Sequence, residues 1–276
     1  MNHMEALSFD LLDKLQVLDE MCPKHPQQKM VQLPGQAPFC PICAASAIEQ
    51  RTQGVITHHM EKRHERTTKD VLRLDSIFDD PDAASCNFAN YVTQPNTEAA
   101  ANRAKARQIA GKYLHNDYQA NTILTGNPGT GKTHLAMAML HAVNDNIKPE
   151  AACLFVSINE LVRRVKDSFN NRGSWYTEEN VTRLISTANL LVLDDLGSEA
   201  SFKRDNTEAS DWVQQLLFGL LNKRRGRTII TTNLTSKQLT KIYNPKLLSR
   251  MYWGVAKNDG VIKFTDATPD KREDLF

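Results

Sequence analysis

One stretch of eight residues, GNPGTGKT, constrains the fold of this chain more than any other feature. It fits the pattern G-x-x-x-x-G-K-[ST], and it lies between an apolar run over residues 122–125 and a predicted helix over 132–144. Glycines allow backbone N–H groups to surround phosphates, and a helix N-terminus adds a favourable field. The pattern predicts a nucleotide site formed by Gly126, Asn127, Pro128, Gly129, Thr130, Gly131, Lys132 and Thr133, with Lys132 at the β and γ phosphates and Thr133 at Mg²⁺.

Short apolar runs alternate with helical patterns through most of the chain. This alternation indicates an α/β fold with a parallel sheet covered by helices on both faces. A length of 276 residues, 41% of them hydrophobic and 24% charged, is typical of one sizeable folded core with a small appendage. Strands are expected over 122–125, 153–158, 190–195, 228–232 and 261–265, and helices over 97–114, 132–144, 159–169, 178–188 and 207–225.

Polar side chains follow two of these expected strands. Asp194 and Asp195 end the apolar run that begins at Leu190, and Asn233 follows the run over 228–232. The carboxyl ends of parallel strands meet at one edge of the sheet, where ligands bind. We therefore expect Asp194 to hold Mg²⁺, Asp195 to orient or deprotonate the attacking water, and Asn233 to position that water.

An arginine lies on a predicted helix beyond the last of these strands. Arg250, in the run LLSRM, has two interpretations that sequence spacing alone does not separate. It either stabilises transition-state charge on a nucleotide held by a neighbouring subunit, or it is a surface arginine of an amphipathic helix.

The N-terminal region carries a group of potential metal ligands. Cys22, His25, Cys40 and Cys43 form two pairs, each separated by two residues, which is the spacing that brings both members of a pair to one tetrahedral ion. Cysteine and histidine together suit Zn²⁺, and a window with few apolar side chains needs such a centre to fold. The alternative for the histidine ligand is His58, His59 or His64, although histidines on a polar helix are usually exposed.

The sequence also predicts how the chain is divided. Leucines at helical spacing indicate a helix over residues 7–18, loops follow over 22–43, and a long polar helix over 44–72. We expect an N-terminal zinc-binding module with a helical extension over 1–70, an irregular linker with two prolines over 71–95, and the α/β domain over 96–276. No apolar stretch approaches the roughly 18 residues that span a bilayer, and no signal-peptide pattern is present, so a cytoplasmic protein without a membrane partner is expected.

Basic residues are concentrated in the later part of the chain. Residues 1–95 carry 9 Lys and Arg against 13 Asp and Glu, whereas the remainder carries 25 against 19. The densest basic run contains Arg224 and Arg225, and Trp175 in a helical insertion offers a ring on which a base could stack. Either these arginines contact single-stranded DNA, or they complement the dipole at a helix end; the sequence leaves both open.

Taken in order, the phosphate loop, the LLVLDDLG strand, the IITTN strand and the Ser-Arg pair resemble an AAA+ ATPase. From about residue 72 onward, FVSINELVRRVKDSF, the helical insertion and IITTNLTSKQL resemble bacterial and phage replicative-helicase loaders of the DnaC and DnaI kind. The resemblance implies Asn233 as the polar sensor, Arg250 as the arginine finger and a lid that is absent or truncated. It also suggests Arg272 as a second sensor. Asp195 stands where many AAA+ proteins have Glu, which implies slow hydrolysis.

The resemblance implies a function as well. A loader of this kind uses ATP, Mg²⁺ and a zinc module that docks on the helicase, and it delivers a hexameric DnaB-type helicase onto single-stranded DNA during replication initiation. Self-association, or a ring templated by the helicase, is part of that expectation. The alternatives are an IstB-like transposition helper ATPase that acts on duplex DNA, and an adaptor in which nucleotide orders the fold without turnover.

Overall fold

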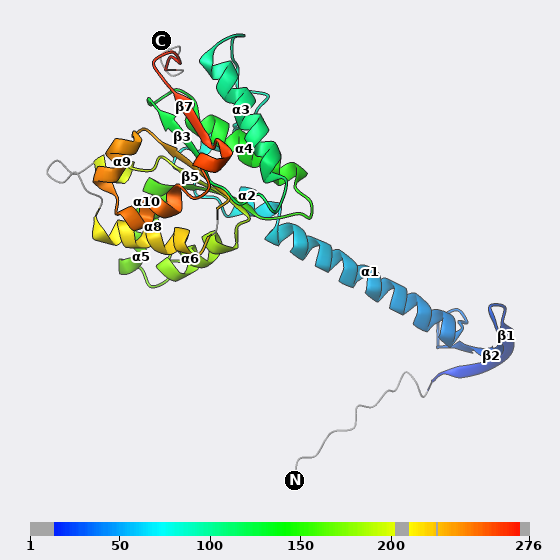
Figure 1. The fold of residues 1–276 in the computed structure, drawn as a ribbon. Helices are drawn as coiled ribbons and strands as arrows, with labels where there is room; N and C mark the ends of the chain where they lie inside the picture. Colours follow the sequence, from blue (N-terminus) through cyan, green and yellow to red (C-terminus); the bar gives the residue numbers. More distant parts are fainter. Residues whose placement is uncertain (1–13, 202–209, 225, 271–276) are drawn as a thin grey trace. The chain divides into compact units, whose positions relative to one another are not determined.

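The computed structural model describes residues 14–201, 210–224 and 226–270. The chain divides into two compact units, Met1–His64 and Glu65–Phe276. Figure 1 shows the elements of each unit. No helix within the described ranges combines the length and apolar character needed to cross a membrane.

The N-terminal unit contains a β-hairpin followed by a helix. Strands β1 (Gln16–Cys22) and β2 (His25–Gln32) are antiparallel, and helix α1 (Pro41–Thr67) begins shortly after them. No residue of α1 is buried, as expected for the polar helix predicted over 44–72. Because the unit buries few apolar side chains, it has little hydrophobic core of its own.

Two expectations for this unit are wrong. A helix was expected over residues 7–18, but residues 16–18 belong to β1, and residues 7–13 lie outside the described part of the chain. Loops were expected over 22–43, yet β2 occupies much of that range. Cross-strand pairing prevails over helical spacing because Val17 pairs with the buried Val31 and Cys22 pairs with His25.

The larger unit is built on a five-stranded parallel sheet, as predicted. Its strand order is β4-β5-β6-β3-β7, so the strand before the phosphate loop lies between the last two strands in sequence. The strands are β3 (Thr122–Gly126), β4 (Cys153–Ser157), β5 (Leu190–Asp194), β6 (Thr228–Thr232) and β7 (Val261–Phe264).

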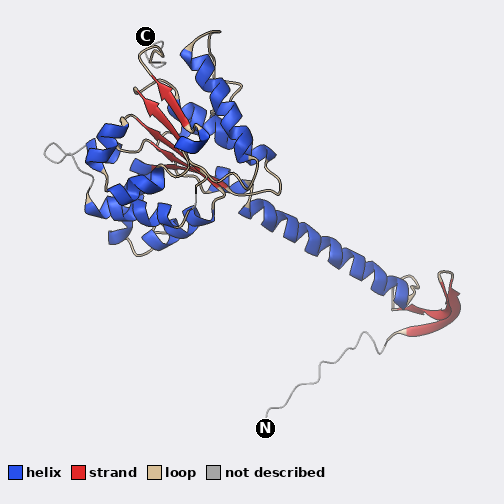
Figure 2. Cartoon of the chain, viewed as in Figure 1, coloured by secondary structure: helices blue, strands red, loops and turns tan. Residues whose placement is uncertain are grey.

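Helices cover both faces of this sheet (Figure 2). Two hydrophobic clusters of buried side chains form the core. Side chains alternate between the faces, as strand geometry requires: Leu191 and Leu193 belong to one cluster, and Leu190 and Val192 to the other. The first cluster packs against α5 (Ile158–Asn170), α6 (Glu178–Thr187), α8 (Asp211–Asn222), α9 (Ser236–Ile242) and α10 (Pro245–Met251). The second packs against α3 (Glu98–Tyr113) and α4 (Lys132–Asn146).

The segment expected to be a linker belongs to the larger unit. It includes α2 (Asp70–Leu74) and the 3₁₀ helix η1 (Pro81–Ser85), and it buries Leu72, Ile77 and Tyr91. Ile77 forms a parallel bridge beside β4, donating its N–H to Phe155 O (2.8 Å) and accepting from Ser157 N (2.8 Å). Because these apolar side chains complete the core, the larger unit begins at Glu65 and includes the segment 71–95.

Three short elements complete the larger unit. They are α7 (Ser198–Ser201), beyond β5, and the 3₁₀ helix η2 (Ala256–Asn258), before β7, together with the segment 265–270 after β7, which contains a turn closed by Thr268 N donating to Thr265 O (3.0 Å). None of the described residues after β7, which are residues 265–270, is helical.

Candidate nucleotide site and metal centre

The phosphate loop connects the end of β3 to the start of α4. Its backbone requires glycine at three positions, because Gly126, Gly129 and Gly131 have φ angles of 143°, 71° and 92°. A Cβ atom on Gly126 would lie 2.0 Å from the carbonyl oxygen of Phe264 on the neighbouring strand β7. The loop therefore has the left-handed, side-chain-free backbone that exposes N–H groups to an anion.

Two side chains within the loop point back to its own backbone. Lys132 is buried, and its Nζ donates to Asn127 O, which also accepts from Thr130 Oγ1 (2.8 Å). An ammonium group removed from water is costly unless it is hydrogen-bonded or paired with an anion. Lys132 is thus placed at the loop as a phosphate ligand requires, and the residues present fit a nucleotide.

Thr133 and Asp194 meet beside the loop, although 61 positions separate them. Thr133 Oγ1 donates to Asp194 Oδ1 (2.9 Å), which also accepts from Thr231 Oγ1 (2.6 Å). Burial raises the pKa of the Asp194 carboxyl to about 6, while the hydrogen bonds from Thr231 and Thr133 lower it. A hydroxyl beside a carboxylate is an oxygen ligand set that suits Mg²⁺, as expected for these two residues.

Asp195 and Asn233 also lie together at this edge. Asn233 Nδ2 donates to Asp195 Oδ1 (3.0 Å), and the backbone N–H of Asp195 donates to Thr231 Oγ1 (2.8 Å). Asp195 has a φ of 58°, a left-handed conformation that Asp tolerates better than most residues. The amide therefore fixes the orientation of the carboxylate expected to act on water.

A cavity of about 410 Å³ joins these groups. It is lined by Lys132, Thr133, Asp194, Asp195 and Asn233 together with other parts of the loop. It is also lined by residues that sequence analysis missed, because they fell in the expected linker: Asp79, Asp80, Asp82 and Cys86 around η1. No sequence pattern marks them, since long-range contacts such as the bridge at Ile77 and the hydrogen bond from Phe155 N to Ser76 Oγ (3.0 Å) bring the segment to the sheet.

His134 is a second residue that the sequence analysis missed. It directly follows the phosphate-loop pattern, lines the cavity and packs edge-to-face on Tyr91, with ring centroids 5.0 Å apart. Its Nε2 donates to Asn90 Oδ1 (2.8 Å). The imidazole thereby attaches the segment around residue 90 to the start of α4. In the sequence, the one indication of this role is that His134 directly follows Thr133.

Two predicted arginines lie away from the cavity or outside the described residues. Arg250 is on α10 and does not line the cavity, and its backbone oxygen accepts from Asn121 Nδ2 (2.9 Å). Arg272 lies outside the described residues.

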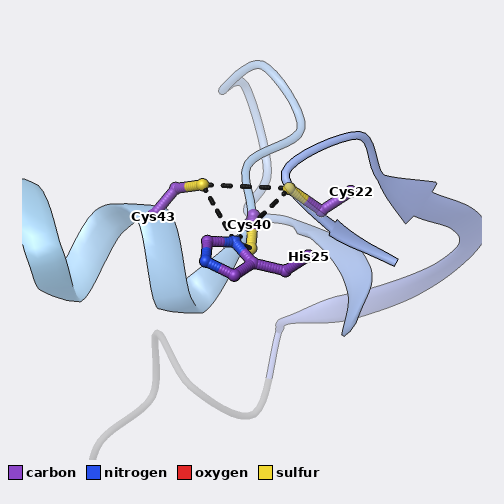
Figure 3. A group of neighbouring side chains, drawn as sticks. All are labelled: Cys22, His25, Cys40 and Cys43. Atoms are coloured by element: carbon purple, nitrogen blue, oxygen red, sulfur yellow. Dashed lines mark hydrogen bonds between the residues drawn. The ribbon is translucent and has the colours of Figure 1, made fainter. Parts of the chain in front are cut away.

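The four predicted metal ligands converge in the N-terminal unit (Figure 3). The ligand atoms of Cys22, His25, Cys40 and Cys43 all lie within 4.8 Å of one another. Cys22 Sγ is 3.8 Å from Cys43 Sγ, and His25 Nδ1 is 3.3 Å from Cys43 Sγ. Ligands bound tetrahedrally to zinc through sulfur and nitrogen lie about 3.5–3.8 Å apart, so this cluster could bind zinc.

The cluster also decides among the candidate histidines. His25 Nδ1 lies 3.7 Å from Cys22 Sγ and 3.6 Å from Cys40 Sγ. His58 and His59 are exposed on α1, where their rings contact each other. His64 is exposed on α1 as well, so His25 is the histidine that lies at the cysteine cluster.

For Arg224 the sequence left DNA contact open, and the structure gives its side chain other partners. Arg224 is half-buried, and its Nη1 donates to the carbonyl oxygens of Ile185 (2.7 Å) and Ala188 (2.6 Å). Its guanidinium holds the end of α6 to β6, so it is not available to a phosphate backbone. Arg225 lies outside the described residues, whereas Trp175 is 49% exposed.

The parallel sheet, phosphate loop and acidic strand end define a P-loop nucleotide-binding protein of the AAA+ class. A family model described as "IstB-like ATP binding protein" matches residues 44–251. The chain belongs to this family.

Proteins with assigned roles resemble the chain over most of its length. It is 27% identical over 205 residues to the "Replicative helicase loader DnaC" of Escherichia coli K12, covering 74% of this chain and 78% of that protein. The loader of the same name from Buchnera aphidicola strain APS is 26% identical over 170 residues, covering 62% of this chain and 64% of that protein. The structure titled "Crystal Structure of the DnaI" has a TM-score of 0.52 and 20% identity, covering 69% of this chain and 95% of that one, and supports the fold. The resemblance to helicase loaders is confirmed.

Proposed function

We propose that this protein is an ATP-controlled loader that binds a hexameric DnaB-type replicative helicase and delivers it onto single-stranded DNA. The similarity to helicase loaders over 205 residues carries this proposal. Within the family, this similarity favours a loader over a transposition helper.

The nucleotide site supports ATP hydrolysis. ATP bound there would supply the γ-phosphoryl group, and Mg²⁺ would neutralise its charge. Lys132 would bind the phosphates, and Thr133 with Asp194 would hold the metal ion. Asp195, oriented by Asn233, would position water and accept its proton. Because the side chain of Asp195 is short, we expect slow ATP turnover. Slow turnover suits a protein that changes state with its bound nucleotide.

Zinc at the cysteine cluster would stabilise the N-terminal unit. Two of the four ligands, Cys22 and Cys40, are buried, and the unit has few other buried side chains. A metal centre supplies folding energy that such a small unit lacks. We assign docking on the helicase to this unit, because its 6 Lys and Arg against 7 Asp and Glu give it no excess of positive charge for a contact with DNA phosphates.

Assembly would supply the last part of the hydrolysis site. Arg250 does not line the cavity of its own chain, so we assign it to the nucleotide site of an adjacent subunit, in a self-assembled ring or one templated by the helicase.

The experiment that tests the loader is co-elution of the purified protein with the replicative helicase of its own host. It is run with and without ATP, and with residues 1–64 deleted. A complex with the full chain that is lost on deletion is the expected result. Cys40→Ser tests the same dependence on the N-terminal unit without shortening the chain.

Two outcomes would contradict the proposal. If no complex forms in any nucleotide state, while duplex DNA stimulates ATP hydrolysis, the protein is a transposition helper of its family. If a complex forms but no ATP is hydrolysed with or without single-stranded DNA, the protein is a nucleotide-ordered adaptor.

A further inference from the structure

The segment that follows β7 contacts the phosphate loop at two points. Asn127 Nδ2 donates to Asp266 Oδ1 (2.6 Å). A Cβ atom on Gly129 would lie only 1.8 Å from Asp270 Oδ1 and 2.1 Å from its carboxyl carbon. The carboxylate of Asp270 therefore lies directly on the backbone of the loop, in a space that only glycine leaves open.

This segment is anchored and does not reach the loop as a loose end. Glu98, in the first turn of α3, accepts from Thr265 N (3.0 Å) and Thr265 Oγ1 (2.8 Å). It also accepts from the hydroxyl of Thr268, which is buried, and these hydrogen bonds lower the pKa of Glu98. Residues 265–268 are thus fixed to α3, and they hold Asp270 against Gly129.

A carboxylate at this position has a chemical consequence. The left-handed Gly129 and Gly131 belong to a backbone that favours negative charge. Gly129 lines the cavity, and Asp270 contacts it from outside that lining. A nucleotide phosphate at the loop would therefore meet a second negative charge already in contact with the loop backbone.

We propose that residues 265–270 form a strap whose Asp270 carboxylate opposes nucleotide phosphates at the phosphate loop, so that nucleotide binding displaces the strap. The strap thereby lowers nucleotide affinity. This inference rests on the proposed nucleotide site and adds a regulatory element to it.

The direct test measures the Kd of Mg²⁺–ADP and of a non-hydrolysable ATP analogue by calorimetry on the full chain. Asp270→Asn keeps the size of the side chain and removes its charge. We expect it to lower both Kd values about five- to tenfold. Asp259→Asn is the matched control, because Asp259 is an exposed acid paired with Lys105 and does not line the cavity; its Kd values should equal those of the wild type.

Hydrogen exchange provides a second measurement that does not depend on affinity. The amide of Thr265 is bonded to Glu98, and that of Thr268 to Thr265 O (3.0 Å). Saturation of the wild type with ADP should speed exchange of the peptide that contains these amides. The same peptide should already exchange faster in Asp270→Asn without nucleotide.

The possible results separate the strap from the site on which it depends. Unchanged or weaker binding by a folded Asp270→Asn variant would overturn the strap and leave the nucleotide site intact, as would slower exchange of the strap peptide on ADP binding. Failure of both wild type and variant to bind nucleotide would overturn the strap and the proposed site together.

Discussion

At the scale of single residues, buried charged side chains lie beside a loop that has glycine at three positions. Lys132 and Asp194 are both buried, and each is held by neutral oxygen groups, the carbonyl of Asn127 for the lysine and threonine hydroxyls for the aspartate. Buried charges of this kind cost stability unless they are compensated. Such a cost is common where a protein is organised to meet a charged ligand.

Replacement of Lys132 by alanine tests this arrangement. Loss of the ammonium removes a charged hydrogen bond to phosphate, so we expect Lys132→Ala to raise the Kd for ATP at least about 100-fold. Calorimetry measures the Kd for ATP, and Lys241→Ala, on the surface of α9, is the control. Binding by Lys132→Ala that stays as tight as in the wild type would show that the loop is not the phosphate site.

At the scale of secondary-structure elements, the close approach of β7 to the phosphate loop determines that position 126 must be glycine. Gly126 ends β3 and pairs with Phe264, so no side chain fits between the strands. Exposed helix positions impose no such condition: a Cβ on Gly111 in α3 would meet nothing within 4 Å.

These two glycines give opposite predictions for the same substitution. Gly126→Ala forces a Cβ onto a backbone oxygen and should lower the free energy of unfolding by about 2–3 kcal/mol. Gly111→Ala should raise it by about 0.5–1 kcal/mol, because alanine favours a helix interior. Urea unfolding of both variants checks the pair; equal effects would mean that the contact with Phe264 costs nothing.

Helix α5 carries an ion cluster that predicts a dependence on pH. Arg163 and Arg164 hydrogen-bond to Glu160 and hold its pKa below the usual value of 4.5. A lowered pKa means that the unfolded chain binds the proton more tightly, so the stabilisation is present above about pH 4.5 and is lost as the pH falls below that value.

Glu160→Gln should therefore lower the Tm at pH 7, in line with a loss of about 1 kcal/mol. The difference from the wild type should shrink at pH 3.5, because below about pH 4.5 the carboxyl of the unfolded chain takes up a proton and the advantage of the folded state falls. Thermal unfolding at the two pH values measures this change. A difference that is the same at both would show that the charge of Glu160 contributes nothing.

At the scale of the whole molecule, the two units are stabilised by different means. The larger unit has two hydrophobic clusters on the two faces of its sheet. The N-terminal unit has few buried side chains, and its cysteine cluster takes the place of a core.

A single ligand substitution should separate the two units. Cys40→Ser is expected to lose one zinc ion per chain and to unfold the N-terminal unit, while the larger unit keeps its Tm. Metal analysis with calorimetric scanning provides both readouts, and Cys86→Ser, outside the cluster, is the control. Retention of a full equivalent of zinc by Cys40→Ser would reject the proposed ligand set.

Assembly is tested by Arg250. Arg250→Ala should leave the Kd for ATP unchanged and reduce turnover in assemblies about 10³-fold or more, the range typical of arginine fingers. Turnover is measured with the helicase present, and the matched control is Lys246→Ala, one turn earlier on α10. Unchanged turnover would show that Arg250 is not an arginine finger but a surface arginine of an amphipathic helix.

Most of the nucleotide site could be predicted because it depends on local signals. The phosphate loop, the Asp-Asp pair and Asn233 each follow a short apolar run that forms a strand. Parallel strands bring their carboxyl ends to one edge of the sheet. The segment around η1 could not be predicted, because proline and polar residues made it resemble a linker. Arg224 likewise resembled a surface charge until its carbonyl partners were known.

The sequence by itself determined the class of fold, the phosphate loop and the set of potential zinc ligands, because periodicity and spacing are local properties of a chain. Only the tertiary structure decided which distant groups meet. It joined Ile77 to the edge of the sheet, placed His25 at the cysteine cluster, bonded Arg224 to backbone carbonyls and brought Asp270 to Gly129. These contacts depend on close packing between segments far apart in sequence, and no local pattern records them.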